Sequence, residues 1–454
     1  MAKTTDRGLE NREIALDILM EVLEKGNFIH LVLGQALQKY QYLEKQDRAF
    51  ITRLAEGTAE RLLTLDAVID RYSKIKTEKQ KPLIRCLLRM SVYQILYMDR
   101  VPDSAACNEA VKLAAKRRFA GLKGFVNGLL RTISREKESL SFEEPSLRLS
   151  LPAWIYQMWE KDLGREQAEA VGESFLRESP TWIRCNESRA SREEILASLR
   201  GQGVTVEETA LSRTSLAISG YDHLEGLEAF CQGWIQVQDV TSALVGELAA
   251  PKKESHVIDV CAAPGGKSIH LADMLKGTGW VDARDLTWQK VSLIEENAAR
   301  CGLTNLGAQV WDARELDPST VETADIVIAD LPCSGLGIIG KKPDIKYRVK
   351  PEDLKELAAL QREILSVVWQ YVKPGGILVY STCTVDRMEN EENARWFEEQ
   401  FPFVPVDLRE RLPGFFEKGS REDTELKEGR IQFLPGIHPY DGFFISVFRR
   451  EGCL

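Results

Sequence analysis

The chain has 454 residues, of which 44% are hydrophobic and 28% are charged, and it carries a net charge of −9. This composition is typical of a soluble globular protein, and the length predicts two or three domains. We find no run of about 18 apolar residues and no apolar signal-peptide core at the N-terminus, so we expect a cytoplasmic protein without a membrane span.

The nine cysteines show no CxxC pair and no His/Cys cluster with the spacing of metal ligands. An odd, unpatterned set is typical of reduced thiols and disfavours both disulfides and a zinc site. We therefore expect no metal, and we expect seven of the nine to be small buried side chains.

Residues 1–140 predict an all-α helical bundle. Apolar residues recur at helical spacing from Leu9 to Leu23, and the same pattern covers Leu62–Tyr72, Pro82–Tyr97 and Asn108–Ala115. The bundle is basic, because residues 1–138 hold 25 lysines and arginines against 18 acidic residues. A basic domain joined to an acidic remainder can bind the phosphates of RNA, although such charges more often belong to solvated surfaces.

Residues 148–235 predict a small α+β module that links the bundle to the rest of the chain. A helix opens at Leu151–Trp154, strands are expected at Trp182–Cys185 and Val204–Val206, and a helix at Arg192–Leu199 lies between these strands. Short alternating helices and strands of this kind are typical of an α+β domain.

Residues 236–454 predict an α/β domain with a Rossmann-like, doubly wound sheet, because strands alternate with helices at the spacing of βαβ units. The expected helices include Lys290–Arg300 and Leu354–Tyr371. The expected strands are Val257–Val260, Trp280–Ala283, Gln309–Val310, Asp325–Ala329 and Ile377–Tyr380.

A glycine-rich loop, Asp259–Lys267, joins the first of these strands to a helix. Its glycines allow backbone amides to approach a ligand, but it lacks the spacing of a Walker A or GxGxxG loop, which disfavours a dinucleotide. Asp285 follows the next strand, where a carboxylate can bind both hydroxyls of a ribose. Asp312 follows the third strand and would either hold an adenine amine or cap a turn. An adenosine cofactor without a pyrophosphate-binding loop indicates S-adenosylmethionine.

Two cysteines follow two further strands, in the motifs Asp330–Gly335 and Ser381–Thr384. Since ligands gather at the carboxyl ends of the strands of an open α/β sheet, we expect both thiols and the Asp330 carboxylate to face one crevice. Such a set is suited to covalent chemistry on an electrophilic carbon. Either cysteine alone would more often be a buried core thiol.

These motifs carry a family resemblance. The loop Cys261–Lys267, the Asp330–Gly335 motif and Ser381–Cys383 together resemble the RNA 5-methylcytosine methyltransferase family. Residues 10–135, which contain the segments Asn108–Val111 and Phe125–Leu130, resemble the NusB-like RNA-binding domain. A NusB-like domain before this catalytic core is similar to the bacterial 16S ribosomal RNA (cytosine-5) methyltransferase branch, so the resemblance covers nearly the whole chain.

The resemblance implies roles for individual residues. Cys383 would be the nucleophile that attacks cytosine C6, and Cys333 would assist removal of the C5 proton and release of the product. Asp330 would contact N3 and the exocyclic amine, and Lys267 would lie between cofactor and base. The implied S-adenosylmethionine contacts are Cys261, Ala262, Ala263, Pro264, Gly265, Gly266, Lys267, Asp285, Asp312 and Asp330.

Further residues leave details open. Asp282 and Arg284 place charges in the second strand, so Asp285 is not the sole candidate for the ribose. Four basic residues after Cys333 are expected either to grip the RNA backbone or to be solvated; they are Lys341, Lys342, Lys346 and Arg348.

Two alternative functions remain at this point. The same 5-methylcytosine chemistry on transfer RNA would use an identical core, and only the helical domain favours ribosomal RNA. A non-catalytic NusB-like RNA-binding factor would leave both cysteines and the cofactor loop unexplained. We expect a monomer, because no heptad pattern or long apolar stripe is present.

Overall fold

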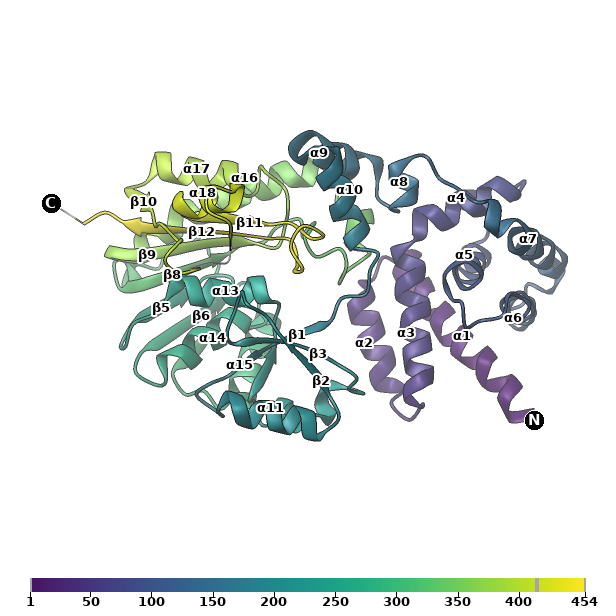
Figure 1. Ribbon diagram of the computed structural model, residues 1–454, viewed down its shortest axis with the longest axis horizontal. Helices are drawn as coiled ribbons and strands as arrows, with labels where there is room; N and C mark the ends of the chain where they lie inside the picture. Colours follow the sequence, from purple (N-terminus) through teal and green to yellow (C-terminus); the bar gives the residue numbers. More distant parts are fainter. Residues whose placement is uncertain (1, 413–415, 453–454) are drawn as a thin grey trace. The chain divides into compact units, whose positions relative to one another are not determined.

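A computed structural model of the chain describes residues 2–412 and 416–452, which fall into two compact units (Figure 1). The helical unit contains the chain up to Arg177 together with the segment Ile339–Arg348, and the catalytic unit contains Glu178–Ile338 and the chain from Val349 onward. None of the described helices is long and apolar enough to cross a membrane.

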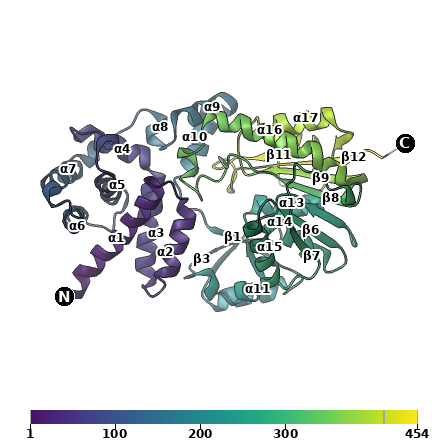
Figure 2. The ribbon, with the colours of Figure 1, turned by 180° about the vertical axis from the view of Figure 1, so that it is seen from behind.

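The helical unit is a bundle around α5, which contacts α1, α3, α4, α6 and α7 (Figure 2). Apolar residues at helical spacing on helices α1 to α7 join in one core, and eleven of the sixteen residues of α5 are buried. Helices α4 and α5 have the predicted bounds. The helices are α1 (Ala2–Leu23), α2 (Ile29–Lys39), α3 (Lys45–Glu60), α4 (Leu62–Tyr72), α5 (Pro82–Tyr97), α6 (Asp103–Lys116), α7 (Lys123–Glu136), α8 (Pro145–Arg148), α9 (Ala153–Leu163) and α10 (Arg165–Ser174).

The catalytic unit begins with a small antiparallel sheet in the order β2-β3-β1-β4, covered by α11. Residues Ser191 and Glu194 form a capping box that starts α11. The predicted strand–helix–strand pattern is confirmed, whereas β3 and β4 were not predicted. The elements are β1 (Thr181–Cys185), α11 (Arg192–Gly201), β2 (Thr205–Glu208), β3 (Ser215–Ser219), α12 (Glu228–Cys231) and β4 (Ile235–Val237).

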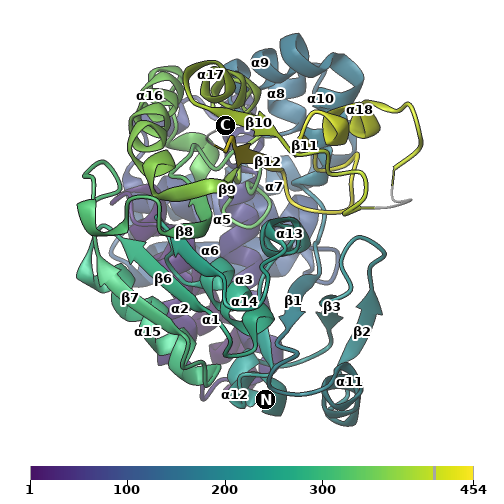
Figure 3. The same ribbon diagram turned by 90° about the vertical axis from the view of Figure 1, so that its left-hand side faces the viewer.

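The main sheet has the strand order β10-β12-β9-β8-β5-β6-β7, with β11 paired to β12. Strands β9, β8, β5, β6 and β7 are parallel to one another, whereas β12 is antiparallel to β9. Strands β8, β6 and β7 lie within one twisted layer in Figure 3. The elements are α13 (Val240–Ala249), β5 (His256–Asp259), α14 (Gly266–Leu275), β6 (Trp280–Asp285), α15 (Trp288–Arg300), β7 (Leu306–Val310), β8 (Ala324–Asp330), α16 (Pro351–Val368), β9 (Val372–Thr382), α17 (Glu391–Gln400), β10 (Phe403–Pro405), α18 (Arg421–Lys427), β11 (Arg430–Phe433) and β12 (Phe443–Arg450).

Helices cover both faces of this sheet, which confirms the Rossmann-like prediction. In β8, Ile326 and Ile328 pack in the core that contains α13 and α14, whereas Val327 and Ala329 pack in the core that contains α16 and α17. This division follows from the two-residue period of a strand. The antiparallel strands β10, β11 and β12 were not predicted, so the sheet is mixed and larger than expected.

All eight cysteines within the described residues are free thiols. The expectation of seven buried cysteines is wrong for Cys231, which is exposed, and Cys261 is only partly buried. Four are buried as expected: Cys86, Cys107, Cys185 and Cys301. The seventh, Cys453, lies outside the described residues.

Candidate active site

The two thiols meet at the carboxyl ends of two paired strands. Strands β8 and β9 are parallel and in register, with Asp330 opposite Ser381, so the turns that follow them start side by side. The Sγ atoms of Cys333 and Cys383 are 3.3 Å apart, and both residues are partly exposed. The structure therefore brings together two thiols that lie 50 residues apart in the sequence.

The turns that carry the thiols are fastened to each other by polar contacts. The hydroxyls of Ser334 and Thr384 are 2.7 Å apart, and the Gly337 N–H donates to the Cys383 carbonyl at 3.0 Å. Both hydroxyl groups are buried. The spacing of the two sulfur atoms is thus held by the backbone and side chains of both turns.

The two thiols are electrostatically unequal. The hydrogen bond to Cys383 raises the pKa of the Cys333 thiol well above its usual value, and burial and the negative charges of Cys383 and Glu389 act in the same direction. Cys333 therefore keeps its proton and can donate it toward a thiolate at Cys383. The thiolate is the nucleophilic form of a cysteine, so the raised pKa of Cys333 makes Cys333 the poorer nucleophile of the pair.

Asp330 lies at the end of β8 between a hydroxyl and a cation. Its Oδ1 accepts a hydrogen bond from Ser381 at 2.7 Å, and its Oδ2 accepts one from the Lys267 ammonium at 2.6 Å. The Lys267 ammonium also lies 5.3 Å from the centre of the Phe443 ring. The structure thus joins the cofactor loop, which contains Lys267, to the strand end next to the thiols.

The loop Cys261–Lys267 turns sharply from β5 into α14. Gly265 has φ +102°, and a Cβ there would lie 3.4 Å from Ile294, so this turn requires glycine. The Ala263 N–H donates to Asp285 Oδ2 at 3.0 Å, which ties the loop to the end of β6. The backbone of the loop and the Asp285 carboxylate therefore border the same space.

The Asp285 side chain is buried, but one of its hydrogen-bond partners is exposed to solvent. Its Oδ1 accepts hydrogen bonds from the Leu286 N–H at 2.7 Å and from the Lys290 ammonium at 2.9 Å. The Lys290 side chain is 53% exposed, so a ribose hydroxyl can replace it at the carboxylate. A carboxylate at a strand end can accept hydrogen bonds from ribose hydroxyls, so Asp285 beside the glycine turn fits the nucleoside part of S-adenosylmethionine.

Asp312 caps its own turn in this structure. Its Oδ1 accepts the Arg314 N–H at 3.0 Å, and its Oδ2 pairs with the Arg314 guanidinium at 2.7 Å. These hydrogen bonds from Arg314 lower the pKa of Asp312. Of the two sequence-based interpretations, turn capping is observed, and contact with an adenine amine stays a prediction.

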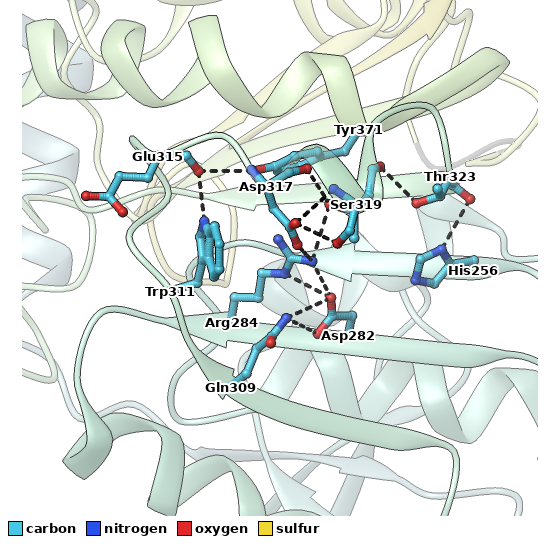
Figure 4. Close-up of polar contacts among 11 residues, drawn as sticks. His256, Asp282, Arg284, Gln309, Trp311, Glu315, Asp317, Ser319, Thr323 and Tyr371 are labelled. Carbon is cyan, nitrogen blue, oxygen red and sulfur yellow. Dashed lines mark hydrogen bonds and ion pairs between the residues drawn. The ribbon is translucent and has the colours of Figure 1, made fainter.

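The charges within β6 belong to a buried network and not to the cofactor site (Figure 4). The Arg284 guanidinium, 1% exposed, lies 2.6 Å from Asp282 and 3.1 Å from Asp317. Gln309 donates a further hydrogen bond to Asp282 at 3.0 Å. Asp282 and Arg284 are bonded to each other and to Asp317 and Gln309 within this network. Asp285 is therefore the ribose candidate of this strand.

The expectation that the basic residues after Cys333 grip RNA is wrong for Lys346. Its ammonium is buried and donates to the Glu60 carbonyl at 2.8 Å, and burial lowers the pKa of Lys346 to about 7. The Arg348 guanidinium likewise donates to the Gly26 carbonyl. These side chains anchor the segment Ile339–Arg348 in the helical unit, and RNA contacts of Lys341 and Lys342 stay predictions.

Sequence reasoning missed three polar residues near the site. Gln238 accepts a hydrogen bond from the buried Arg184 at 2.7 Å, and its amide lies 3.7 Å from where a Cβ of Gly266 would be. Glu389 and Gln361 lie behind the Cys333 turn. Within the described residues, no group of three or more His, Cys, Asp or Glu side chains is placed to hold a metal ion.

Comparison with known proteins decides the family. The profile of the 16S rRNA methyltransferase RsmB/F family matches residues 247–449, that of the NusB family matches residues 9–135, and that of the RsmF/B-like ferredoxin-like domain matches residues 151–222. The probable ribosomal RNA small subunit methyltransferase B of Bacillus subtilis is 37% identical, covering 97% of this chain and 99% of that protein. The chain belongs to the ribosomal RNA small subunit methyltransferase B family.

Other relatives of this methyltransferase agree with the assignment. The probable small subunit methyltransferase B of Synechocystis is 32% identical over 97% of this chain and 99% of its own length. The crystal structure of PH0851 has a TM-score of 0.82 and 28% identity and covers 98% of both chains. A methyltransferase homolog from Pyrococcus horikoshii has a TM-score of 0.59 and 25% identity, covering 67% of this chain and 97% of its own.

The family assignment confirms the predicted resemblance and the predicted fold class. The chain is an enzyme of the S-adenosylmethionine-dependent 16S rRNA methyltransferases. The target atom, the covalent step and the roles of individual residues go beyond this assignment.

Proposed function

We propose that this methyltransferase transfers a methyl group from S-adenosylmethionine to C5 of a cytosine in 16S ribosomal RNA through a covalent bond between Cys383 Sγ and C6. The observation that carries the proposal is the pair of thiols 3.3 Å apart beside the Asp330 carboxylate. A methyltransferase acting on an oxygen or an exocyclic amine needs no such pair, because its target atom already has a nucleophilic lone pair.

Cytosine C5 is a weak nucleophile, and covalent addition at C6 overcomes this. The Cys383 thiolate attacks C6, the C5–C6 double bond opens, and C5 becomes enamine-like. Asp330, which accepts hydrogen bonds from Ser381 and Lys267, is the group proposed to bond N3 and the exocyclic amine, where charge develops during addition. The bound cofactor supplies the methyl group as an electrophile.

Release requires loss of the C5 proton. After methylation, C5 holds both the methyl group and its original hydrogen, and the S–C6 bond breaks only when that proton leaves. The proposed acceptor is Cys333, whose sulfur lies beside Cys383. Once Cys383 is bonded to C6, the Cys333 thiol releases its own proton to solvent, and the resulting thiolate takes the C5 proton. Removal of the proton restores the C5–C6 double bond and expels Cys383 as a thiolate.

The cofactor contacts proposed for this chain are the loop Cys261–Lys267, Asp285 at the ribose and Asp312 at the adenine amine. The domains are proposed as 1–140 and 148–235 for RNA binding and 236–454 for catalysis. The target cytosine must be unpaired or flipped out of a helix, because addition to C6 needs access above the ring.

The test uses labelled S-adenosylmethionine, with small-subunit ribosomal RNA and bulk transfer RNA from cells that lack the protein offered separately. Label in 5-methylcytosine of ribosomal RNA that disappears in Cys383→Ala, together with a trapped protein–RNA adduct in Cys333→Ala, is the expected result. Cys231→Ala is the matched control, because it removes an exposed thiol elsewhere in the same unit. Normal methylation by Cys383→Ala would contradict the covalent step, and label only in transfer RNA would contradict the substrate.

A further inference from the structure

A buried carboxyl group lies directly behind the Cys333 turn. Glu389 is fully buried, and its Oε2 accepts two hydrogen bonds of 2.9 Å, from the Ser334 N–H and from Gln361 Nε2. The other oxygen, Oε1, is buried without a hydrogen-bond partner within the described residues. A charged carboxyl group in this setting lowers the stability of the fold, so we expect Glu389 to have a function that offsets this loss.

Gln361 of α16 connects this carboxyl group to the other side of Cys333. Its Nε2 also donates to the Pro332 carbonyl at 2.9 Å, and its Oε1 accepts the Tyr380 hydroxyl at 3.0 Å. The residues on both sides of Cys333 are therefore bound to the Glu389–Gln361 pair. This pair fixes where Cys333 lies and places a titratable charge beside its turn.

Two thiols 3.3 Å apart share protons, so their charge is a property of the pair. With one proton between them, the thiolate is either Cys383 or Cys333, and the other thiol donates its hydrogen bond to it. A nearby negative charge disfavours the thiolate on the side where it lies. The electrostatic effect of Glu389 on Cys333 is of this kind and adds to the larger effects of Cys383 and burial on the pKa of Cys333.

We propose that Glu389 is a positioning residue that decides which thiol carries the negative charge, directing it to Cys383 and leaving the proton on Cys333. This inference rests on the proposed function, in which Cys383 is the nucleophile and Cys333 the release group. A neutral residue in its place would leave the turn in position but would weaken the distinction between the two thiols.

The charge of Glu389 changes near neutral pH. Burial, together with the negative charge of Asp386, raises the pKa of Glu389 to about 7, although hydrogen bonds from Ser334 and Gln361 oppose this rise. The Tyr380 hydroxyl donates to the Glu389 carbonyl. Glu389 is therefore mostly neutral at pH 6 and mostly charged at pH 8.

The two one-proton forms of the thiol pair bind the same number of protons, so their ratio changes with pH only if a neighbouring group titrates. Among the described residues, Glu389 is the side chain other than Cys383 whose negative charge acts on Cys333, and its pKa lies near neutral. Ionisation of its carboxyl group disfavours a thiolate at Cys333, so the share of thiolate on Cys333 should fall from pH 6 to pH 8.

The experiment measures this ratio by alkylation. The full-length protein without RNA or cofactor is treated with limiting iodoacetamide, a thiolate sulfur displaces iodide, and mass spectrometry gives the labelling of Cys333 relative to Cys383. In the wild type we expect the ratio to fall between pH 6 and pH 8. In Glu389→Gln we expect it to be about tenfold higher than wild type at pH 8, the effect of one pKa unit, and nearly independent of pH.

Gln361→Met is the matched control: it removes hydrogen bonds to the same turn but keeps a carboxyl group at Glu389. Because the Gln361 hydrogen bond no longer opposes the rise in the pKa of Glu389, the ratio should keep its pH dependence and fall at a higher pH. An unchanged ratio in Glu389→Gln, or an equal change in Gln361→Met, would overturn the inference in favour of a purely structural role. If Glu389→Gln does not fold, a wild-type ratio that stays constant between pH 6 and pH 8 overturns it. Because alkylation requires no methyl transfer, a failure of the proposed function would be seen separately, in the RNA assay.

Discussion

The charged residues inside strand β6 and those at the strand ends of the same sheet have different surroundings, although Arg284 and Asp285 are adjacent in sequence. Inside the sheet, Arg284 is 1% exposed and pairs with Asp282 and Asp317 (Figure 4). At the strand end, Asp285 pairs with Lys290, whose side chain is 53% exposed. A buried ion network keeps its partners and supports the fold, whereas a carboxylate whose cation can move into solvent is available to a ligand.

The largest effect that this comparison predicts is on stability. Arg284→Met leaves two buried carboxylates without their cation, and removing one partner of a buried ion network costs about 3–5 kcal/mol of unfolding free energy. Urea denaturation measures this loss, and isothermal titration should show nearly unchanged affinity of the folded variant for S-adenosylmethionine.

Arg314→Met is the control for that variant, because Arg314 pairs with Asp312 at the surface and is 46% exposed. Loss of this ion pair should lower the free energy of unfolding by less than about 1 kcal/mol. Equal destabilisation by the two variants would show that burial of the network does not determine its contribution.

The next effect is on cofactor affinity. Asp285→Asn removes the charge that we propose binds the ribose hydroxyls, and hydrogen bonds to a charged group contribute about 1.5–3 kcal/mol. The dissociation constant for S-adenosylmethionine should therefore rise by about 10- to 100-fold. Isothermal titration measures it, with the free energy of unfolding as the control. A variant that binds the cofactor as the wild type does would assign the ribose to another residue.

Local patterns were sufficient for part of the helical bundle and for the parallel strands. Apolar spacing predicted the bounds of α4 and α5, because each buries one stripe against the same core. Strand β12 was missed because its first six residues are all buried, and a buried run without alternation can belong to a helix as well as to a strand. Only pairing with β9, more than 60 residues earlier in the chain, identifies it as a strand.

The same limit applies to the site. Cys333 and Cys383 were predicted to meet because each directly follows a strand, and this depends on neighbouring residues alone. Lys346 was misjudged because its partner, the Glu60 carbonyl, is 286 residues away in sequence. Glu389 was missed for a similar reason, since its environment comes from Ser334 and Gln361 and a surface glutamate has the same local sequence pattern.

The smallest effect expected is that of Asp312→Asn. The carboxylate of Asp312 is already bonded to the Arg314 N–H and guanidinium, and asparagine keeps an oxygen that can cap the turn and accept an adenine amine. The affinity for S-adenosylmethionine should fall by about threefold, the value of a weakened neutral hydrogen bond. Isothermal titration of Asp312→Asn and of Asp285→Asn with S-adenosylmethionine compares the two affinities directly. An effect as large as that of Asp285→Asn would show that the ion pair between Asp312 and Arg314 opens when the cofactor binds. The cofactor would then replace the arginine at Asp312 in the same way as we propose that it replaces the exposed lysine at Asp285.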